Sequence, residues 1–124
     1  MKRGIGDNIG RGGGRGPSKY AVTFDLDTQT LEASYGGASW RNADMEIRKT
    51  LDEYGFDWQR GSVYFGGDKV DAVTCVIAIQ ELAQRFPWFA PSVRDIRMLR
   101  IEDNNDLMPA VERIARRAEQ RDKR

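Results

Sequence analysis

The order of hydrophobic patterns along the chain constrains its fold more than any other feature of the sequence. Short segments rich in β-branched and aromatic residues are typical of strands, whereas longer segments with an apolar residue every three or four positions are typical of helices. The predicted strands cover residues 20–26, 56–58, 62–65 and 92–102, and the predicted helices cover residues 39–54, 68–86 and 106–118. The order is therefore strand, helix, strand, strand, helix, strand, followed by one more helix.

Several residues mark where the predicted helices begin and end. Ser39, Asp68 and Asp106 each precede a helical segment and have side chains suited to an N-cap. Gly55 can adopt the left-handed conformation that ends a helix, and Pro87 ends the second helix because a helix seldom continues through the residue before proline.

This order predicts the ferredoxin-like βαββαβ fold, an α+β architecture in which an antiparallel sheet carries two helices on one face. A C-terminal helix follows that unit. A domain this small leaves a sheet face and its edge strands uncovered, so the sequence also predicts a homodimer. Trp58, Tyr64, Trp88 and Phe89 are aromatic residues expected on the surface that the dimer covers, with a packed corner of the core as the alternative for Trp88 and Phe89.

The 124 residues suit one domain, and the two ends of the chain are basic while its middle is acidic. Residues 1–19 hold five Lys or Arg against one Asp, residues 111–124 hold six against three acids, and residues 20–110 carry a net charge of −6. The basic ends either attract a polyanion such as RNA or only keep the chain soluble. The predicted organisation is a disordered Gly/Arg-rich leader over 1–18, a folded domain over 19–118 and a basic tail over 119–124.

The sequence contains no histidine and a single cysteine, Cys75. These counts exclude Ser-His-Asp and Cys-His catalysis, the usual zinc sites and an internal disulfide. A lone cysteine fits the reducing cytoplasm, and no apolar run has the length of a membrane span. Any chemistry must therefore use carboxylates, hydroxyls, Arg or Lys, or a hard metal ion held by oxygen ligands.

Asp25 is the first candidate for such chemistry because it stands where the first predicted strand ends. A carboxylate in that position can coordinate Mg²⁺ or accept a proton from a nucleophile. In the alternative interpretation, Asp25 and Asp27 only end the strand and cap the next turn.

A second candidate is the turn at Arg60, Gly61 and Ser62. The Gly-Ser step exposes backbone amides and a hydroxyl that can hold a phosphate oxygen, and Arg60 adds a guanidinium suited to phosphate. The alternative is an ordinary hairpin turn.

The third candidate is the last predicted strand, in which Arg94, Arg97 and Arg100 recur every three residues. Strand alternation places Arg94 and Arg100 on one face and Asp95 and Arg97 on the other. Charges on both faces are unusual for a strand that we expect near the centre of the sheet. Either Asp95 and Arg97 form a structural ion pair, or these residues line a site for a polyanion.

Four separated segments resemble the virulence-associated protein D (VapD) family in order and spacing: residues 20–26 (YAVTFDL), 55–64 (GFDWQRGSVY), 88–89 (WF) and 92–97 (SVRDIR). The resemblance runs from about Tyr20 to Val111. It departs from the family pattern at Arg60, an extra residue between Gln59 and Gly61.

The resemblance implies an endoribonuclease, often the toxin of a toxin–antitoxin pair, that works as a homodimer. It also implies a ferredoxin-like fold shared with the small nuclease subunit of CRISPR adaptation, in which a carboxylate at the end of the first strand lies near the dimer axis and is tied to metal-dependent cleavage. Asp25 matches that carboxylate. The residues carried over are Asp25 and Ser62 as catalytic, Asp25 as a ligand of Mg²⁺, Arg60, Arg94 and Arg97 as RNA-binding, and Asp95 as supporting.

Two other function classes remain open from the sequence. One is a non-catalytic nucleic-acid-binding homodimer, which needs the basic ends but not Asp25. The other is a ferredoxin-like metabolite-binding regulator, which would use the open face of the sheet or a cleft between two copies.

Overall fold

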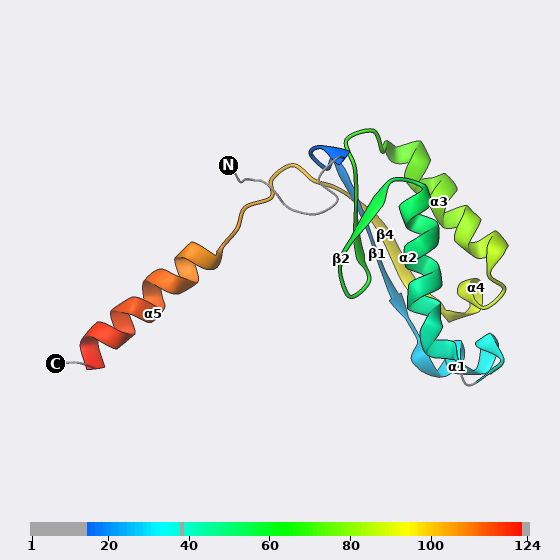
Figure 1. Cartoon of the computed structure of the whole chain (residues 1–124), viewed down its shortest axis with the longest axis horizontal. Helices are drawn as coiled ribbons and strands as arrows, with labels where there is room; N and C mark the ends of the chain where they lie inside the picture. Colours follow the sequence, from blue (N-terminus) through cyan, green and yellow to red (C-terminus); the bar gives the residue numbers. More distant parts are fainter. Residues whose placement is uncertain (1–14, 38, 123–124) are drawn as a thin grey trace.

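The structure of this protein is a computed structural model that describes residues 15–37 and 39–122. The elements follow one another as β1 (Tyr20–Leu26), α1 (Thr28–Tyr35), the 3₁₀ helix η2 (Trp40–Asn42), α2 (Ala43–Glu53), β2 (Phe56–Arg60), β3 (Val63–Gly66), α3 (Ala72–Arg85), α4 (Phe89–Ser92), β4 (Val93–Arg100) and α5 (Met108–Asp122) (Figure 1). The predicted α+β class is confirmed, and α1 and α4 are short additions to the predicted order. The predicted helix over residues 39–54 is divided into η2 and α2.

The four strands form one antiparallel sheet in the order β2-β3-β1-β4, which is consistent with the ferredoxin-like fold. β1 lies in the middle, so that Val22 faces Tyr64 of β3 on one side and Met98 of β4 on the other. The prediction that residues 92–102 form a central strand is therefore wrong, because among the described strands β4 pairs with β1 alone and lies at the edge. An edge strand tolerates charged side chains on both faces because both remain in contact with water.

The core lies between the sheet and the helices α2 and α3, which cover the same face (Figure 1). Val22 and Phe24 of β1 pack there against Ile47 of α2 and Leu82 of α3. The opposite face of the sheet carries no helix of the described chain, and we call it the open face. Since Val22 and Phe24 point into the core, the alternating residues Thr23 and Asp25 lie on the open face.

Three of the aromatic residues expected on the surface belong to this core. Tyr64, Trp88 and Phe89 are buried, so the prediction of a surface is wrong for them, and the packed corner is the correct interpretation of Trp88 and Phe89. Among the four, Trp58 alone is exposed. Cys75 is also buried, as a small core residue, and burial raises the pKa of its thiol, which keeps it in the unreactive protonated form.

The helix ends explain most of the differences from the predicted boundaries. Asp27 caps α1, since its Oδ1 accepts the amide N–H of Gln29 at 3.0 Å. Ser39 makes no capping bond, and Asp71 rather than Asp68 caps α3 by accepting the amide of Thr74 at 2.8 Å.

Two other predicted helix ends are confirmed. Gly55 has a φ of +96°, in the left-handed region that ends α2, and Asp106 accepts the amide of Met108 at the start of α5 at 2.9 Å.

The two ends of the described chain behave differently. Residues 1–14 of the predicted leader lie outside the described residues, whereas Arg15 forms ion pairs with Asp52 at 3.0 Å and Asp57 at 3.1 Å. At the other end, α5 stands clear of the body and buries none of its residues (Figure 1). α5 also runs without interruption through residue 118, where the sequence placed the boundary of the basic tail. Within residues 15–37 and 39–122, no helix has the length and apolar character needed to cross a membrane.

Candidate active site at the end of β1

Two carboxylates lie side by side on the open face where β1 ends. Asp25 of β1 is directly opposite Asp95 of β4 in the antiparallel register. Residues paired in this way have Cβ atoms about 4.5–5.5 Å apart. Both side chains are open to solvent, with 61% of Asp25 and 51% of Asp95 exposed. Like charges so close destabilise a strand pair unless cations balance them.

Arg94 supplies the first of these cations through an irregularity in β4. The pairing passes from Asp25–Asp95 to Leu26–Val93, which leaves Arg94 as an extra residue in a β-bulge. A bulge redirects the side chain of the residue it contains. The guanidinium Nη2 of Arg94 lies 3.2 Å from Oδ2 of Asp25. The prediction that Arg94 shares a face with Arg100 is therefore wrong, because the bulge turns Arg94 towards Asp25.

Arg97 supplies the second cation. Its Nε donates to both carboxylate oxygens of Asp95, at 3.0 and 3.2 Å, which confirms the predicted ion pair. Because 69% of the Arg97 side chain is exposed, the pair stabilises the fold by only about 0.2–1 kcal/mol. Its charges remain accessible to a polyanion. We call Asp25, Arg94, Asp95 and Arg97 the carboxylate–arginine cluster.

The β2–β3 hairpin ends beside this cluster. The backbone oxygen of Ser62 accepts the N–H of Phe24 at 3.2 Å, so the hairpin turn lies next to the residue that precedes Asp25. Gly61 has a φ of +50°, which its lack of a side chain permits. Arg60 is exposed at the end of β2. The backbone of Ser62 therefore lies against β1, next to the cluster. Arg60 belongs to the same turn as Ser62.

The extra residue in the hairpin is absorbed by a second bulge. The pairing of β2 with β3 passes from Trp58–Tyr64 to Arg60–Val63, which leaves Gln59 unpaired. The register of β3 with β1 is continuous, so the insertion does not displace Ser62 from β1. Trp58 closes the turn by donating its indole N–H to the Gly61 oxygen at 2.9 Å.

Trp58 and Arg48 form a second surface, on the α2 side of the sheet, that the sequence did not reveal. The Arg48 guanidinium carbon lies 3.8 Å from the centre of the Trp58 ring, a cation–π contact. A cavity of about 360 Å³ borders both side chains and Lys49. Arg48 and Lys49 come from α2 and Trp58 from β2, and the spacing of these residues along the chain carries no sign of the contact.

The described residues contain no group of three or more Asp, Glu, Cys or His side chains able to hold a metal ion together. Asp25 and Asp95 offer two carboxylates, and Mg²⁺ is commonly held by one or two carboxylates together with substrate phosphates and water. The donor set thus fits a Mg²⁺ ion that arrives with a phosphate, and does not form a complete protein cage.

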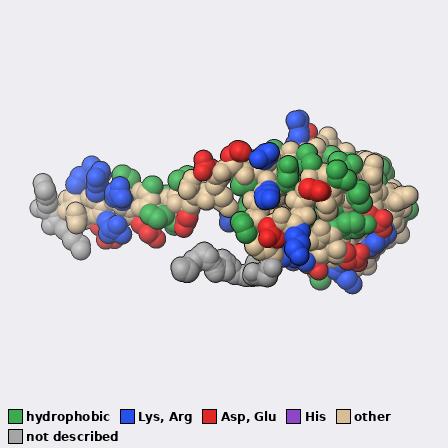
Figure 2. Space-filling model, turned by 90° about the horizontal axis from the view of Figure 1, so that it is seen from above, with side chains coloured by type: hydrophobic (Ala, Val, Ile, Leu, Met, Phe, Trp, Pro, Cys, Tyr) green, Lys and Arg blue, Asp and Glu red, His purple; other side chains and the backbone are tan. Residues whose placement is uncertain are grey.

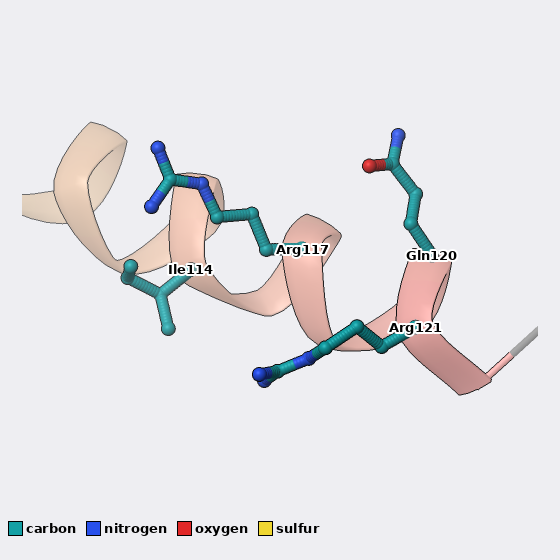
Figure 3. Close-up of a pocket in the computed structure, with 4 residues that line it drawn as sticks. All are labelled: Ile114, Arg117, Gln120 and Arg121. Atoms are coloured by element: carbon teal, nitrogen blue, oxygen red, sulfur yellow. The ribbon is translucent and has the colours of Figure 1, made fainter.

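Arginines also gather on α5, away from the cluster (Figure 2). Ile114, Arg117, Gln120 and Arg121 border an open hollow of about 350 Å³, and all four belong to this one helix (Figure 3). The arginines make one side of α5 positively charged, although the helix also carries Glu112, Glu119 and Asp122.

Comparison with known proteins identifies close relatives, although no family model matches the chain. Endoribonuclease VapD 2 of Riemerella anatipestifer is 50% identical over 92 residues, which are 74% of this chain and 98% of the relative. An endoribonuclease VapD homolog of Helicobacter pylori is 54% identical over 92 residues, which are 74% of this chain and 95% of that protein. Endoribonuclease VapD of Dichelobacter nodosus is 40% identical over 92 residues, 74% of this chain and 96% of its own length. With such identities over nearly the whole length of these relatives, the chain belongs to the VapD family.

Proposed function

We propose that this protein is an endoribonuclease that cleaves RNA phosphodiester bonds at the carboxylate–arginine cluster. The observation that carries the proposal is the contact between Asp25 and Arg94, which places a carboxylate and a guanidinium together on an exposed surface. The names of the relatives support the same activity. In a chain without histidine, this cluster offers both a base and a group that stabilises negative charge.

The reaction proposed is attack of a ribose 2′-hydroxyl on the adjacent phosphorus. The 2′-oxygen–phosphorus bond forms and the bond to the 5′-oxygen of the next nucleotide breaks, leaving a 2′,3′-cyclic phosphate and a 5′-hydroxyl. Asp25 accepts the proton of the 2′-hydroxyl, and the departing 5′-oxygen takes a proton from water.

Arg94 has two partners in this scheme. Without RNA its guanidinium neutralises Asp25 at 3.2 Å. A bound phosphate competes for the same guanidinium, because arginine pairs well with phosphate oxygens. When Arg94 moves to the phosphate, the Asp25 carboxylate becomes free to act as the base. Arg97 then adds a second positive charge to stabilise the pentacovalent phosphate.

The hairpin turn positions the substrate. The Ser62 hydroxyl hydrogen-bonds a phosphate oxygen close to Asp25, and exposed Arg60 holds a neighbouring phosphate. This assignment is supported by the backbone contact between Ser62 and Phe24, which keeps the turn beside the end of β1.

Mg²⁺ is the proposed cofactor, and Asp25 and Asp95 are the residues that would hold it. When bound, the ion supplies positive charge that helps to neutralise the phosphate. Asp95 also orients Arg97, whose Nε it accepts at 3.0 Å.

The proposed working form is a homodimer joined through the open sheet faces, so that the two Asp25 residues face one another across the two-fold axis. Support comes from the open face and from edge strand β4, on which Leu99 is 49% exposed. We further propose that the protein is a cytoplasmic toxin, with an antitoxin protein as its partner. The lone buried Cys75 suits a reducing compartment.

The test of the activity is cleavage of labelled RNA by Asp25→Asn, which keeps the shape of the side chain and removes its charge. We expect cleavage to fall about 100-fold or more, the usual contribution of a general base. The matched control is Asp103→Asn, which removes an equivalent charge from an exposed position outside the cluster. Equal cleavage by the folded Asp25→Asn protein and its parent would refute the proposal.

A non-catalytic RNA-binding dimer is the second candidate function, and the arginines of α5 favour it. In that case the parent and Asp25→Asn proteins bind RNA equally and neither cleaves it.

A further inference from the structure

α5 carries an apolar stripe that nothing in the described chain covers. Val111, Ile114, Ala115 and Ala118 recur every three or four residues and therefore lie on one side of the helix. Val111 is 57% and Ile114 58% exposed, and no residue of α5 is buried. A helix with an apolar stripe in water is normally stabilised by packing that stripe against another surface.

A second uncovered apolar surface lies between α3 and β4. It is a groove of about 210 Å³ bordered by Val76 and Ile79 of α3 and by Ile96 and Met98 of β4. Val76 is 52% and Met98 46% exposed. Its polar neighbours are Gln80 and Arg97, at the margin of an otherwise hydrophobic surface. A monomer seldom leaves apolar surface of this kind contiguous and unpaired.

We infer that α5 of one copy packs its apolar stripe into the α3–β4 groove of a second copy, and that each copy gives and receives one helix. The inference rests on the proposed homodimer and adds a contact to it. The two surfaces match in length, because the 15 residues of α5 and the 14 of α3 form helices of about 22 and 21 Å.

The direction of α5 favours the groove of a second copy over that of its own chain. In Figure 1, α2 and α3 lie on one side of the sheet, and residues 101–107 lead α5 away on the other side. A partner that packs against the open face lies on the side to which α5 extends, and its groove lies on the α3 side of its own sheet. α5 therefore has to pass the β4 edge of the partner, and residues 101–107 can span about 23 Å to do so. The body over residues 20–110 carries a net charge of −6 and residues 111–124 carry +3, so long-range attraction favours association of α5 with a body in either copy.

Docking in this orientation keeps the basic side of α5 available. On a helix of 3.6 residues per turn, Arg113 and Arg116 lie opposite the stripe that contains Ile114 and Ala118. These arginines therefore stay in water when the stripe is covered. The same helix can then fasten two copies together and present positive charge to RNA. The family resemblance ends near Val111, so most of this contact is an addition of this chain to the shared domain.

The first experiment compares Ile114→Asp with Gln120→Asp in sedimentation equilibrium of the full-length protein. Both variants add one negative charge to α5, but only Ile114 belongs to the stripe. We expect Ile114→Asp to raise the Kd of the dimer at least tenfold and Gln120→Asp to leave it within about twofold, since the stripe loses one buried apolar side chain in each copy. Val76→Asp in the groove should match Ile114→Asp.

A mixing experiment separates contact between copies from contact within one chain. Chains with Ile114→Asp keep an intact groove, and chains with Val76→Asp keep an intact helix. A mixed dimer regains one helix in one groove, so we expect its Kd to lie between that of the parent and those of the single variants. A helix docked on its own chain cannot be restored by mixing, and a mixed Kd no better than that of either variant alone would overturn the inference.

The remaining outcomes distinguish this contact from the dimer on which it rests. A parent protein that is monomeric at tens of micromolar refutes both the dimer and the helix exchange. A dimeric parent whose Kd is unchanged by Ile114→Asp refutes the exchange alone and leaves the dimer through the open faces standing.

Discussion

Asp25 and Asp95 show how a single pair of opposed residues can define a site. Neither carboxylate is unusual by itself, and each lies in the open face of an ordinary antiparallel ladder. Two like charges this close need nearby cations to balance them, and two arginines do so. The bulge at Arg94 brings its guanidinium to Asp25. The guanidinium groups that neutralise the two carboxylates are therefore the same groups that we propose bind the phosphate.

The exposed Asp95–Arg97 pair leads to a prediction about Arg97→Ala. We expect the free energy of unfolding to change by less than about 1 kcal/mol, because an exposed ion pair contributes little. RNA cleavage should nevertheless fall at least tenfold, since a positive charge beside the phosphate is lost. Urea unfolding and a cleavage assay measure the two effects.

Arg100→Ala is the control for this prediction. Arg100 is on the same strand and pairs with Glu102 at 3.4 Å, with similar exposure, but lies away from the cluster. Loss of stability by several kcal/mol in Arg97→Ala would mean that the pair is chiefly structural.

The two carboxylates also predict how Mg²⁺ should act. We expect chelation by EDTA to reduce cleavage and added Mg²⁺ to restore it. Asp95→Asn should raise the Mg²⁺ concentration that gives half-maximal cleavage, because one of the two carboxylate ligands becomes a neutral amide. Cleavage that is insensitive to EDTA would show instead that Asp25 works as a base without a metal.

At the scale of the elements, the extra residue in the β2–β3 hairpin changes both the length of the backbone and its charge, and a substitution can test the charge alone. Arg60→Ala keeps the bulge at Gln59 and removes only the guanidinium. We expect RNA affinity to decrease and the slope of log affinity against log salt to decrease by about one, with no change in melting temperature.

The control for Arg60→Ala is Arg41→Ala. Arg41 stacks on Trp40, 4.8 Å from the ring centre, in the segment before α2. An equal loss of affinity in both variants would indicate a general effect of charge and no specific contact at the hairpin.

The elements also show why part of this structure can be predicted from the sequence. Strands and helices with a strong apolar period, such as β1, α2 and α3, fall where the pattern places them because their side chains form the core. α1 escapes prediction because its only buried residue is Leu31, so it lacks a clear apolar period, and its capping bond from Asp27 is a better guide to it. The position of β4 at the edge is a property of the sheet as a whole, and local sequence cannot reveal it.

The sequence suggests the candidate residues of the site but not the contacts between them. Asp25, Arg94, Asp95 and Arg97 do lie together, but the particular contacts depend on strand register and on the bulge at Arg94. A bulge adds a single residue to one strand and has no distinctive composition. The contact of Trp58 with Arg48 likewise depends on how α2 crosses the sheet, so only the structure could show it.

At the scale of the whole molecule, Arg15 divides the N-terminal region into two parts with different expected effects. Removal of residues 1–14 takes away Lys2, Arg3 and Arg11 and spares the ion pairs of Arg15. We expect this truncation to weaken RNA binding and flatten its salt dependence without a change in melting temperature, because counterion release falls while the body is intact. Removal of residues 1–18 should also lower the melting temperature.

Affinity measured across a salt series and thermal unfolding distinguish these expectations. An unchanged salt slope after removal of residues 1–14 would show that this segment does not contact RNA. An unchanged melting temperature after removal of residues 1–18 would show that the Arg15 ion pairs do not stabilise the body.

The separation of α5 from the body has a consequence for how this protein can evolve. Substitutions within β1 or α3 must satisfy the packing of a shared core, so few of them are neutral for folding. Substitutions in α5 disturb no buried residue of the same chain. A lineage can therefore explore new sequences in this helix, altering the strength with which the protein associates or attracts nucleic acid, while purifying selection on the folded body continues undisturbed.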